Sequence, residues 1–227
     1  MHTESTLLDK PEHTGTIVTS VRSFRYQVQT STQATAAGQY CDGLRGALII
    51  YDPNDPHKSL YDIDDASTII SIADCPPNST LINGKGRYPG GPEQTFAIIK
   101  RYRFCVISMV CDPRYDFSID GHSMSIIEAD GISHKPVNVD KFTIFAGQRY
   151  SAVIKADQPV GNYCVHANPY FPGTPGFAGG VNSAILRYKG APNANPTTSE
   201  KANPKLFKET DIYPVENPGA VRAIRWL

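Results

Sequence analysis

Short stretches of alternating apolar and polar residues run along most of the chain and predict β-strands. The clearest is 102–110. Most of its alternate residues, starting from Tyr102, are apolar, and in an extended chain they lie on one side. Further strands are expected at 47–51, 68–73, 115–119, 123–128, 142–145, 150–156, 162–167 and 183–188. No long stretch shows the apolar stripe of a helix.

Turn-forming pairs separate these stretches and indicate how the strands are connected. Glycine ends the pairs Asp120-Gly121, Asp130-Gly131, Ala146-Gly147 and Val160-Gly161. Many short strands joined by such turns are typical of a sandwich or barrel. We therefore expect an all-β fold.

The two ends of the chain differ in composition from this β-rich middle. Residues 1–16 are polar and lack the apolar run of a signal peptide. From Gly190 to Pro204 the chain is rich in Pro, Asn, Thr and Ala, which predicts an exposed, semi-rigid connector. Only a short segment follows it, ending at Trp226-Leu227, so we expect a truncated product.

Bulk properties exclude several classes of partner. The 227 residues can bury one β core, or one core and a fragment of a second. Basic and acidic side chains are equal in number, 22 of each, which gives no electrostatic reason to expect nucleic acid or an anionic membrane as a partner. No apolar run is long enough to span a bilayer.

The chain has five cysteines, an odd number, so at least one cannot take part in an intrachain disulfide. A bridge between Cys41 and Cys111 would close a loop of about 70 residues, worth roughly 4 kcal/mol in the chain-entropy model. The residues alone leave other pairings open. Asn78-Ser79-Thr80 is a glycosylation sequon, which matters only if the chain is secreted.

Metal sites need several ligands that converge, and the six histidines are widely spaced: His2, His13, His57, His122, His134 and His166. Cys164-Val165-His166 is the one close Cys/His pair, and alternate strand residues share a face. Two half-buried strand residues are the simpler interpretation of this pair. We expect His122 to bond a backbone group after its turn, and His57 to be solvated. No nucleophile elbow or recognised Cys/His catalytic arrangement is present.

Several segments resemble fungal laccases, and the similarity runs from Ile17 to Tyr213. The segments that carry it are Gln39–Gly46, Tyr51–His57, Thr80–Arg87, Lys100–Phe104, Phe117–His122, Phe145–Tyr150 and Asn182–Tyr188. The resemblance implies cupredoxin-like Greek-key domains in a secreted three-domain glycoprotein. Laccases oxidise phenols and reduce dioxygen to water, using a type 1 copper and a three-copper cluster.

The same resemblance assigns roles to individual residues. Cys41 and Cys111 match a disulfide between domains, which supports the pairing considered above. Asp112 matches the carboxylate that hydrogen-bonds the phenolic substrate. Asn168 and Phe171 match a loop that lines the same pocket.

The copper-binding motifs of the family are missing. Nothing before Ile17 resembles its His-Trp-His motif, and Ala34-Thr35-Ala36-Ala37-Gly38 stands where a His-Ser-His motif belongs. Cys75-Pro76-Pro77 replaces a Trp-Tyr-His motif, and the other ligands belong to a third domain. Cys164 and His166 replace the usual Trp and Arg and recreate no known site. We therefore expect this chain to bind no copper.

The expected division of the chain is an unrelated tail at 1–16, a remnant of a first cupredoxin domain at 17–50, a central cupredoxin-like domain at 51–190, and a linker with a truncated tail at 191–227. Three hypotheses follow. The chain is a laccase by descent that is inactive alone, or a non-catalytic module that binds phenolics, glycans or a protein partner, or itself, through exposed domain interfaces. The third, an unconventional metalloenzyme using Cys164, His166 and the tail histidines, is the weakest.

Overall fold

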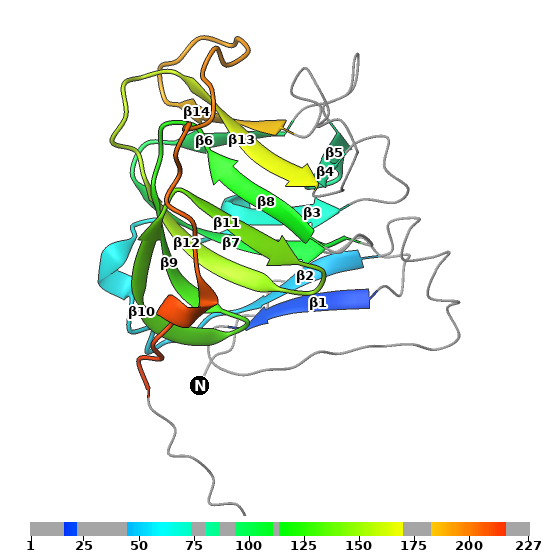
Figure 1. Cartoon of the computed structure of the whole chain (residues 1–227), viewed down its shortest axis with the longest axis vertical. Helices are drawn as coiled ribbons and strands as arrows, with labels where there is room; N and C mark the ends of the chain where they lie inside the picture. The colour runs from blue at the N-terminus through cyan, green and yellow to red at the C-terminus, as the bar shows by residue number, and fades with distance from the viewer. Residues whose placement is uncertain are drawn as a thin grey trace, which may run out of the picture.

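The computed structural model describes residues 16–21, 45–73, 80–86, 94–110, 114–169 and 183–216. Within them, two sheets pack face to face as a sandwich (Figure 1). The larger sheet has seven strands, in the order β10 (Ile132–Val139), β9 (Met124–Ala129), β12 (Arg149–Lys155), β7 (Arg101–Met109), β3 (Ile69–Ala73), β4 (Leu81–Ile82) and β5 (Lys85–Gly86). The smaller sheet has five, in the order β11 (Lys141–Phe145), β8 (Arg114–Ile119), β13 (Asn162–Pro169), β14 (Ser183–Tyr188) and β6 (Thr95–Ile98).

The remaining elements lie outside the sandwich. The strands β1 (Thr16–Val21) and β2 (Arg45–Ile50) pair in parallel as a separate two-stranded sheet. Three short 3-10 helices are η1 (Lys58–Leu60), η2 (Ala66–Thr68) and η3 (Glu209–Asp211). None of the helices in the described part of the chain has the length and apolar character needed to cross a membrane. The expected all-β fold is confirmed.

The strand β7 is buried on both faces. Tyr102, Phe104 and Val106 point into the core between the sheets, as the alternating pattern predicted. The opposite face of the strand carries Cys105, Ile107 and Met109, which pack with Ile49 of β2 and nearby apolar side chains in a second cluster. Both faces of β7 are therefore covered by other parts of the protein. A strand that is buried on both faces is usually apolar along most of its length, as β7 is.

A buried ion network occupies the other end of that outer face. The Arg103 side chain is 1% exposed and forms ion pairs with the carboxylates of Asp55 and Glu128. Its guanidinium also donates to Ser151 Oγ at 3.2 Å, and the hydroxyl of Tyr61 donates to Asp55. Each buried charge is thus paired, as burial requires.

The connector crosses the small sheet in an extended path and is held by side chains of the sandwich (Figure 1). Asp140 Oδ2 accepts from the Lys205 backbone N–H at 2.8 Å, and Asp140 Oδ1 accepts from Lys201 Nζ at 2.7 Å. Further along, the Phe207 ring packs edge-on against Tyr150, with centroids 5.3 Å apart. The connector is mostly exposed, as expected, and it is also docked.

Replacing Arg103 with Met is expected to destabilise the fold by about 3–5 kcal/mol, because Asp55 and Glu128 would remain buried without a cation. Urea unfolding followed by circular dichroism measures this loss. The matched control is Arg101→Met, which removes a pair with Asp62 that is 40% and 35% exposed at its two side chains. Equal losses in the two variants would contradict the buried network.

The contribution of Asp140 to stability is expected to depend on pH. Burial alone raises the pKa of this carboxyl, but hydrogen bonds from Lys201 and Ser123 outweigh burial and lower the pKa from 3.8 to about 2. The stabilisation is therefore complete above pH 3.8 and is lost as pH falls towards 2. The measurement is the difference in unfolding free energy between wild type and Asp140→Asn, which should be constant near neutral pH and shrink in acid. A difference that grows in acid, or one matched by the exposed control Asp157→Asn, would contradict this assignment.

Candidate functional site

A polar cluster lies on the outer face of the five-stranded sheet, beneath the connector. Along β13, Tyr163, Val165 and Ala167 are buried in the core, so the alternate residues Cys164 and His166 point outward. The neighbouring β8 strand pairs with β13 in antiparallel register. This register brings Asp120, just after β8, beside Cys164, and the Asp120 backbone N–H donates to the Cys164 carbonyl at 3.0 Å.

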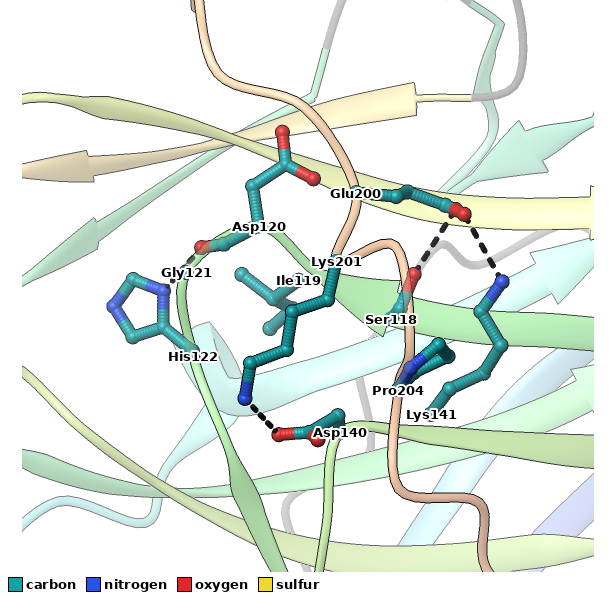
Figure 2. A pocket seen from close by; sticks show the side chains of 10 residues that line it. All are labelled: Ser118, Ile119, Asp120, Gly121, His122, Asp140, Lys141, Glu200, Lys201 and Pro204. Atoms are coloured by element: carbon teal, nitrogen blue, oxygen red, sulfur yellow. Dashed lines mark hydrogen bonds and ion pairs between the residues drawn. The ribbon is translucent and has the colours of Figure 1, made fainter.

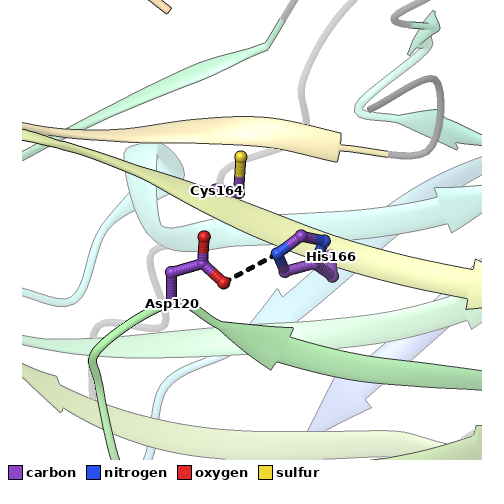
Figure 3. Close-up of side chains that lie close together, drawn as sticks. All are labelled: Asp120, Cys164 and His166. Atoms are coloured by element: carbon purple, nitrogen blue, oxygen red, sulfur yellow. Dashed lines mark hydrogen bonds and ion pairs between the residues drawn. The ribbon is translucent and has the colours of Figure 1, made fainter. Parts of the chain in front are cut away.

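Asp120, Cys164 and His166 offer three different donor atoms at one place (Figure 3). One carboxylate oxygen, the thiol sulfur and one imidazole nitrogen all lie within 4.8 Å of one another. His166 Nε2 is 2.8 Å from Asp120 Oδ1. The Asp120 side chain is fully buried and that of His166 is 16% exposed. Cys164 and His166 share a face of the strand, as their spacing allowed, and both are partly buried, as the simpler interpretation expected; the nearby carboxylate was not predicted.

The connector supplies two further side chains to the cluster. Thr198 Oγ1 donates to Asp120 Oδ2 at 2.6 Å. Glu200 Oε1 lies 3.7 Å from His166 Nδ1, on the opposite side of the ring from Asp120. Glu200 also accepts from Ser118 Oγ at 3.1 Å and from Lys141 Nζ at 3.0 Å (Figure 2). The imidazole is thus held between two carboxylates.

Both carboxylates are charged at neutral pH. Burial on its own raises the pKa of Asp120, but hydrogen bonds from His166 and Thr198 bring the pKa below its usual value. Burial also raises the pKa of Glu200. The hydrogen bond from Lys141 and the electrostatic effect of His166 act in the opposite direction and are together stronger, so the pKa of Glu200 is below its usual value. The cluster therefore presents two anionic carboxylates, one fully buried on Asp120 and one 32% exposed on Glu200.

Two hollows differ in what they can hold. A cavity of about 10 Å³ lies under the connector, lined by Ser118, Asp120, Asp140, Glu200 and Lys201 among others (Figure 2). It has room for about one water molecule and none for an aromatic ring. A cleft of about 570 Å³ lies over the seven-stranded sheet, lined by Gly46, Ala47, Ala66, Ile69, Ser71, Ala73, Leu81, Asn83, Gly84 and Met109.

The structure places some of the predicted site residues and not others. Asn168, expected in a substrate pocket, lies on β13, where its Nδ2 donates to Glu200 Oε1 at 3.0 Å. Asp112, Phe171, the cysteines Cys41 and Cys111, and the sequon residue Asn78 lie outside the described residues. Their predicted roles stay predictions.

Two histidine predictions were tested with different outcomes. His122 is 2.7 Å from the Asp120 carbonyl through Nδ1, as expected, and its Nε2 is 2.7 Å from the Tyr188 hydroxyl. The prediction for His57 was wrong, because His57 is only 6% exposed. Its backbone N–H donates to Asp55, and burial lowers the pKa of its ring. The turn that contains it folds over the buried Arg103.

Sequence reasoning missed three members of the cluster, Asp120, Thr198 and Glu200. Asp120 was assigned only to a turn, and its approach to Cys164 depends on strand register, which one sequence does not reveal. Thr198 and Glu200 lie in a segment whose composition indicated an exposed connector. A polar stripe on alternate residues of both strands was the one available signal.

Comparison with known proteins gives the lineage. The sequence pattern of the multicopper oxidase family matches residues 51–191. The chain is 51% identical to Laccase-2 of Pleurotus ostreatus over 89% of its own length and 42% of that protein. It is 52% identical to Laccase-3 of Trametes villosa over 87% of its own length and 45% of that protein. The chain thus spans less than half the length of these curated relatives.

Solved structures agree with the fold. The crystal structure of the laccase from Botrytis aclada matches with a TM-score of 0.61 and 24% identity, covering 73% of this chain and 35% of that one. This likeness, at low identity, confirms the cupredoxin-like sandwich. Since the family pattern covers more than half of its residues, the chain belongs to the multicopper oxidase family.

Proposed function

We propose that this chain is a laccase-related polypeptide that does not oxidise phenols with dioxygen by itself. The family reaction takes single electrons from phenols and delivers four to dioxygen, which is work for redox-active metal ions held by the protein. Copper supplies that chemistry when it is bound. The proposal therefore depends on whether this chain's residues fit the copper centres of the family.

One observation carries the proposal: in the described residues no three imidazoles gather at one point, although His57 and His134 lie close enough to influence each other's pKa. Copper centres of this kind are built from several histidine ligands at one point. In the part of the chain that the structure describes, the one group of three metal-ligating side chains is Asp120, Cys164 and His166, which contains a single imidazole. The family's histidine motifs are also replaced in the sequence, by Ala34–Gly38 and by Cys75-Pro76-Pro77. Neither these sequence segments nor the described residues fit the family's copper sites.

The purified chain, incubated with copper and then desalted, is expected to show no phenol-dependent oxygen uptake above that of a heat-denatured sample. The reason is that the described residues gather no histidine cluster of the kind that would hold copper ions to pass electrons to dioxygen. An oxygen electrode makes the measurement, with a full-length fungal laccase, stripped of copper and reloaded in the same way, as the positive control. Sustained catalytic oxygen uptake by this chain would overturn the proposal.

A second function, binding without oxidation, is favoured by the cleft over the seven-stranded sheet. Its volume of about 570 Å³ is within the range of small-molecule sites, and its walls combine small apolar residues with the polar Ser71 and Asn83. Asn83 is fixed there, because its Oδ1 accepts from the Ser71 backbone N–H at 2.7 Å. A phenol could place its ring against Ala47 and Ala73 and its hydroxyl near these polar groups.

Phenol is expected to bind this cleft weakly, with a dissociation constant in the millimolar range, equivalent to about −4 kcal/mol. The change Ala66→Phe fills part of the cleft and should weaken binding several-fold. Ala97→Phe is the matched control, since Ala97 is also an exposed alanine but lies on β6, away from the cleft lining. Titration followed by methyl NMR checks both. Equal binding by the two variants would exclude the cleft as the site.

A further inference from the structure

We propose that Asp120, Cys164 and His166 form a binding site for a single divalent zinc ion. The proposal does not depend on whether the chain oxidises phenols, because zinc carries no redox chemistry. It concerns the cluster on the outer face of the five-stranded sheet, which corresponds to none of the family's copper motifs.

The three donor types suit zinc. Zn²⁺ binds thiolate sulfur, imidazole nitrogen and carboxylate oxygen, commonly in a tetrahedral arrangement. With usual bond lengths, tetrahedral ligand atoms lie about 3.3–3.6 Å from one another. The three donor atoms here lie within 4.8 Å of one another, and the closest pair, His166 Nε2 and Asp120 Oδ1, is 2.8 Å apart. The separations here differ from the tetrahedral ones by about 1 Å at most, a change on the scale of side-chain rotation.

Charge is balanced when the ion is bound. The Asp120 carboxylate and the Cys164 thiolate carry two negative charges, and a neutral imidazole adds none. A zinc ion therefore makes the group neutral, which favours binding where the carboxylate has no exposure to water. Binding releases the thiol proton of Cys164, and any proton on the imidazole, to solvent.

The groups around the donors supply one supporting hydrogen bond and one nearby carboxylate. Histidine ligands usually donate their other ring N–H to a carboxylate or carbonyl, which fixes the tautomer and the ring. Here His166 Nδ1 lies 3.7 Å from Glu200 Oε1, which is longer than a hydrogen bond, so a small shift of the Glu200 side chain is needed to form one, while Nε2 faces Asp120. Ligating carboxylates are usually hydrogen-bonded too, and Asp120 Oδ2 accepts from Thr198 Oγ1 at 2.6 Å.

Glu200 is itself held in place by the sheet. Its Oε1 accepts from Ser118 and Asn168, and its Oε2 accepts from Lys141. Three protein ligands leave the fourth tetrahedral position to a water molecule or a small anion, which is the composition of an open zinc site. The connector that carries Thr198 and Glu200 thus completes the site, and zinc should in turn hold the connector to the sheet.

The test is titration of the chelator-treated full chain with Zn²⁺ by calorimetry and with Co²⁺ by visible absorbance. We expect one ion per chain and, with cobalt, a sulfur-to-metal charge-transfer band. Cys164→Ser should abolish this band and the zinc heat. The matched control is Cys105→Ala, which changes the other cysteine in the described residues. Cys105 is a buried residue of β7 in the seven-stranded sheet, so this change should leave the cobalt band and the zinc heat as they are. Circular dichroism confirms that each variant is folded.

A second pair of variants tests the role of the connector. Glu200→Gln should weaken zinc binding about 10- to 100-fold, as loss of a carboxylate partner of a histidine ligand does elsewhere. The matched control Glu209→Gln removes an exposed carboxylate on η3 that bonds Gln148 and Tyr150 and none of the ligands, and should leave the affinity unchanged. No saturable zinc binding in the micromolar range, or a cobalt spectrum that Cys164→Ser leaves unchanged, would overturn the proposal.

Discussion

The antiparallel register between β8 and β13 is the constraint on which the polar face of this protein depends. It sets His166 opposite Ser118 and joins Asp120 to Cys164 through a backbone hydrogen bond. A shift of one residue would turn Cys164 and His166 into the core and bring Val165 and Ala167 outward. The apolar core fixes the register, and the register assembles the cluster.

The connector then turns this face into an enclosed site. Without the contacts of Thr198 and Glu200, the cluster would be an exposed patch on a sheet. With them, Asp120 is fully shielded and both nitrogens of His166 face carboxylates. Asp140 holds the next part of the connector through Lys201 and the Lys205 backbone, so the same segment closes the sandwich and completes the site.

Sequence pattern predicted most of the longer strands but missed β1 and β10, and it also missed the short strands β4, β5 and β6. The alternation in 102–110 identified β7 and the core face that holds Phe104, because burial of one face imposes period two. β10 escaped notice because Pro136 interrupts its pattern, and the structure shows a register shift between Ser133 and Val137. β4 and β5 are two residues each and exist as a hairpin around Asn83 and Gly84, both with positive φ.

The site was half predictable for the same reason. Cys164 and His166 are two residues apart, so their shared face follows from strand geometry alone. Asp120 and Glu200 join them through register and connector docking, which are tertiary features. The buried His57 was missed because its turn looks polar, and only the fold shows that it covers the Arg103 network.

Together these features describe a cupredoxin-like sandwich whose described residues form no cluster of three histidines and bring Asp120, Cys164 and His166 together on its polar face. X-ray anomalous scattering from crystals grown with both copper and zinc tests this most directly. The account predicts a single metal peak, bounded by the Cys164 sulfur, His166 and Asp120. Several copper peaks, each ligated by two or more histidines of this chain, would contradict it.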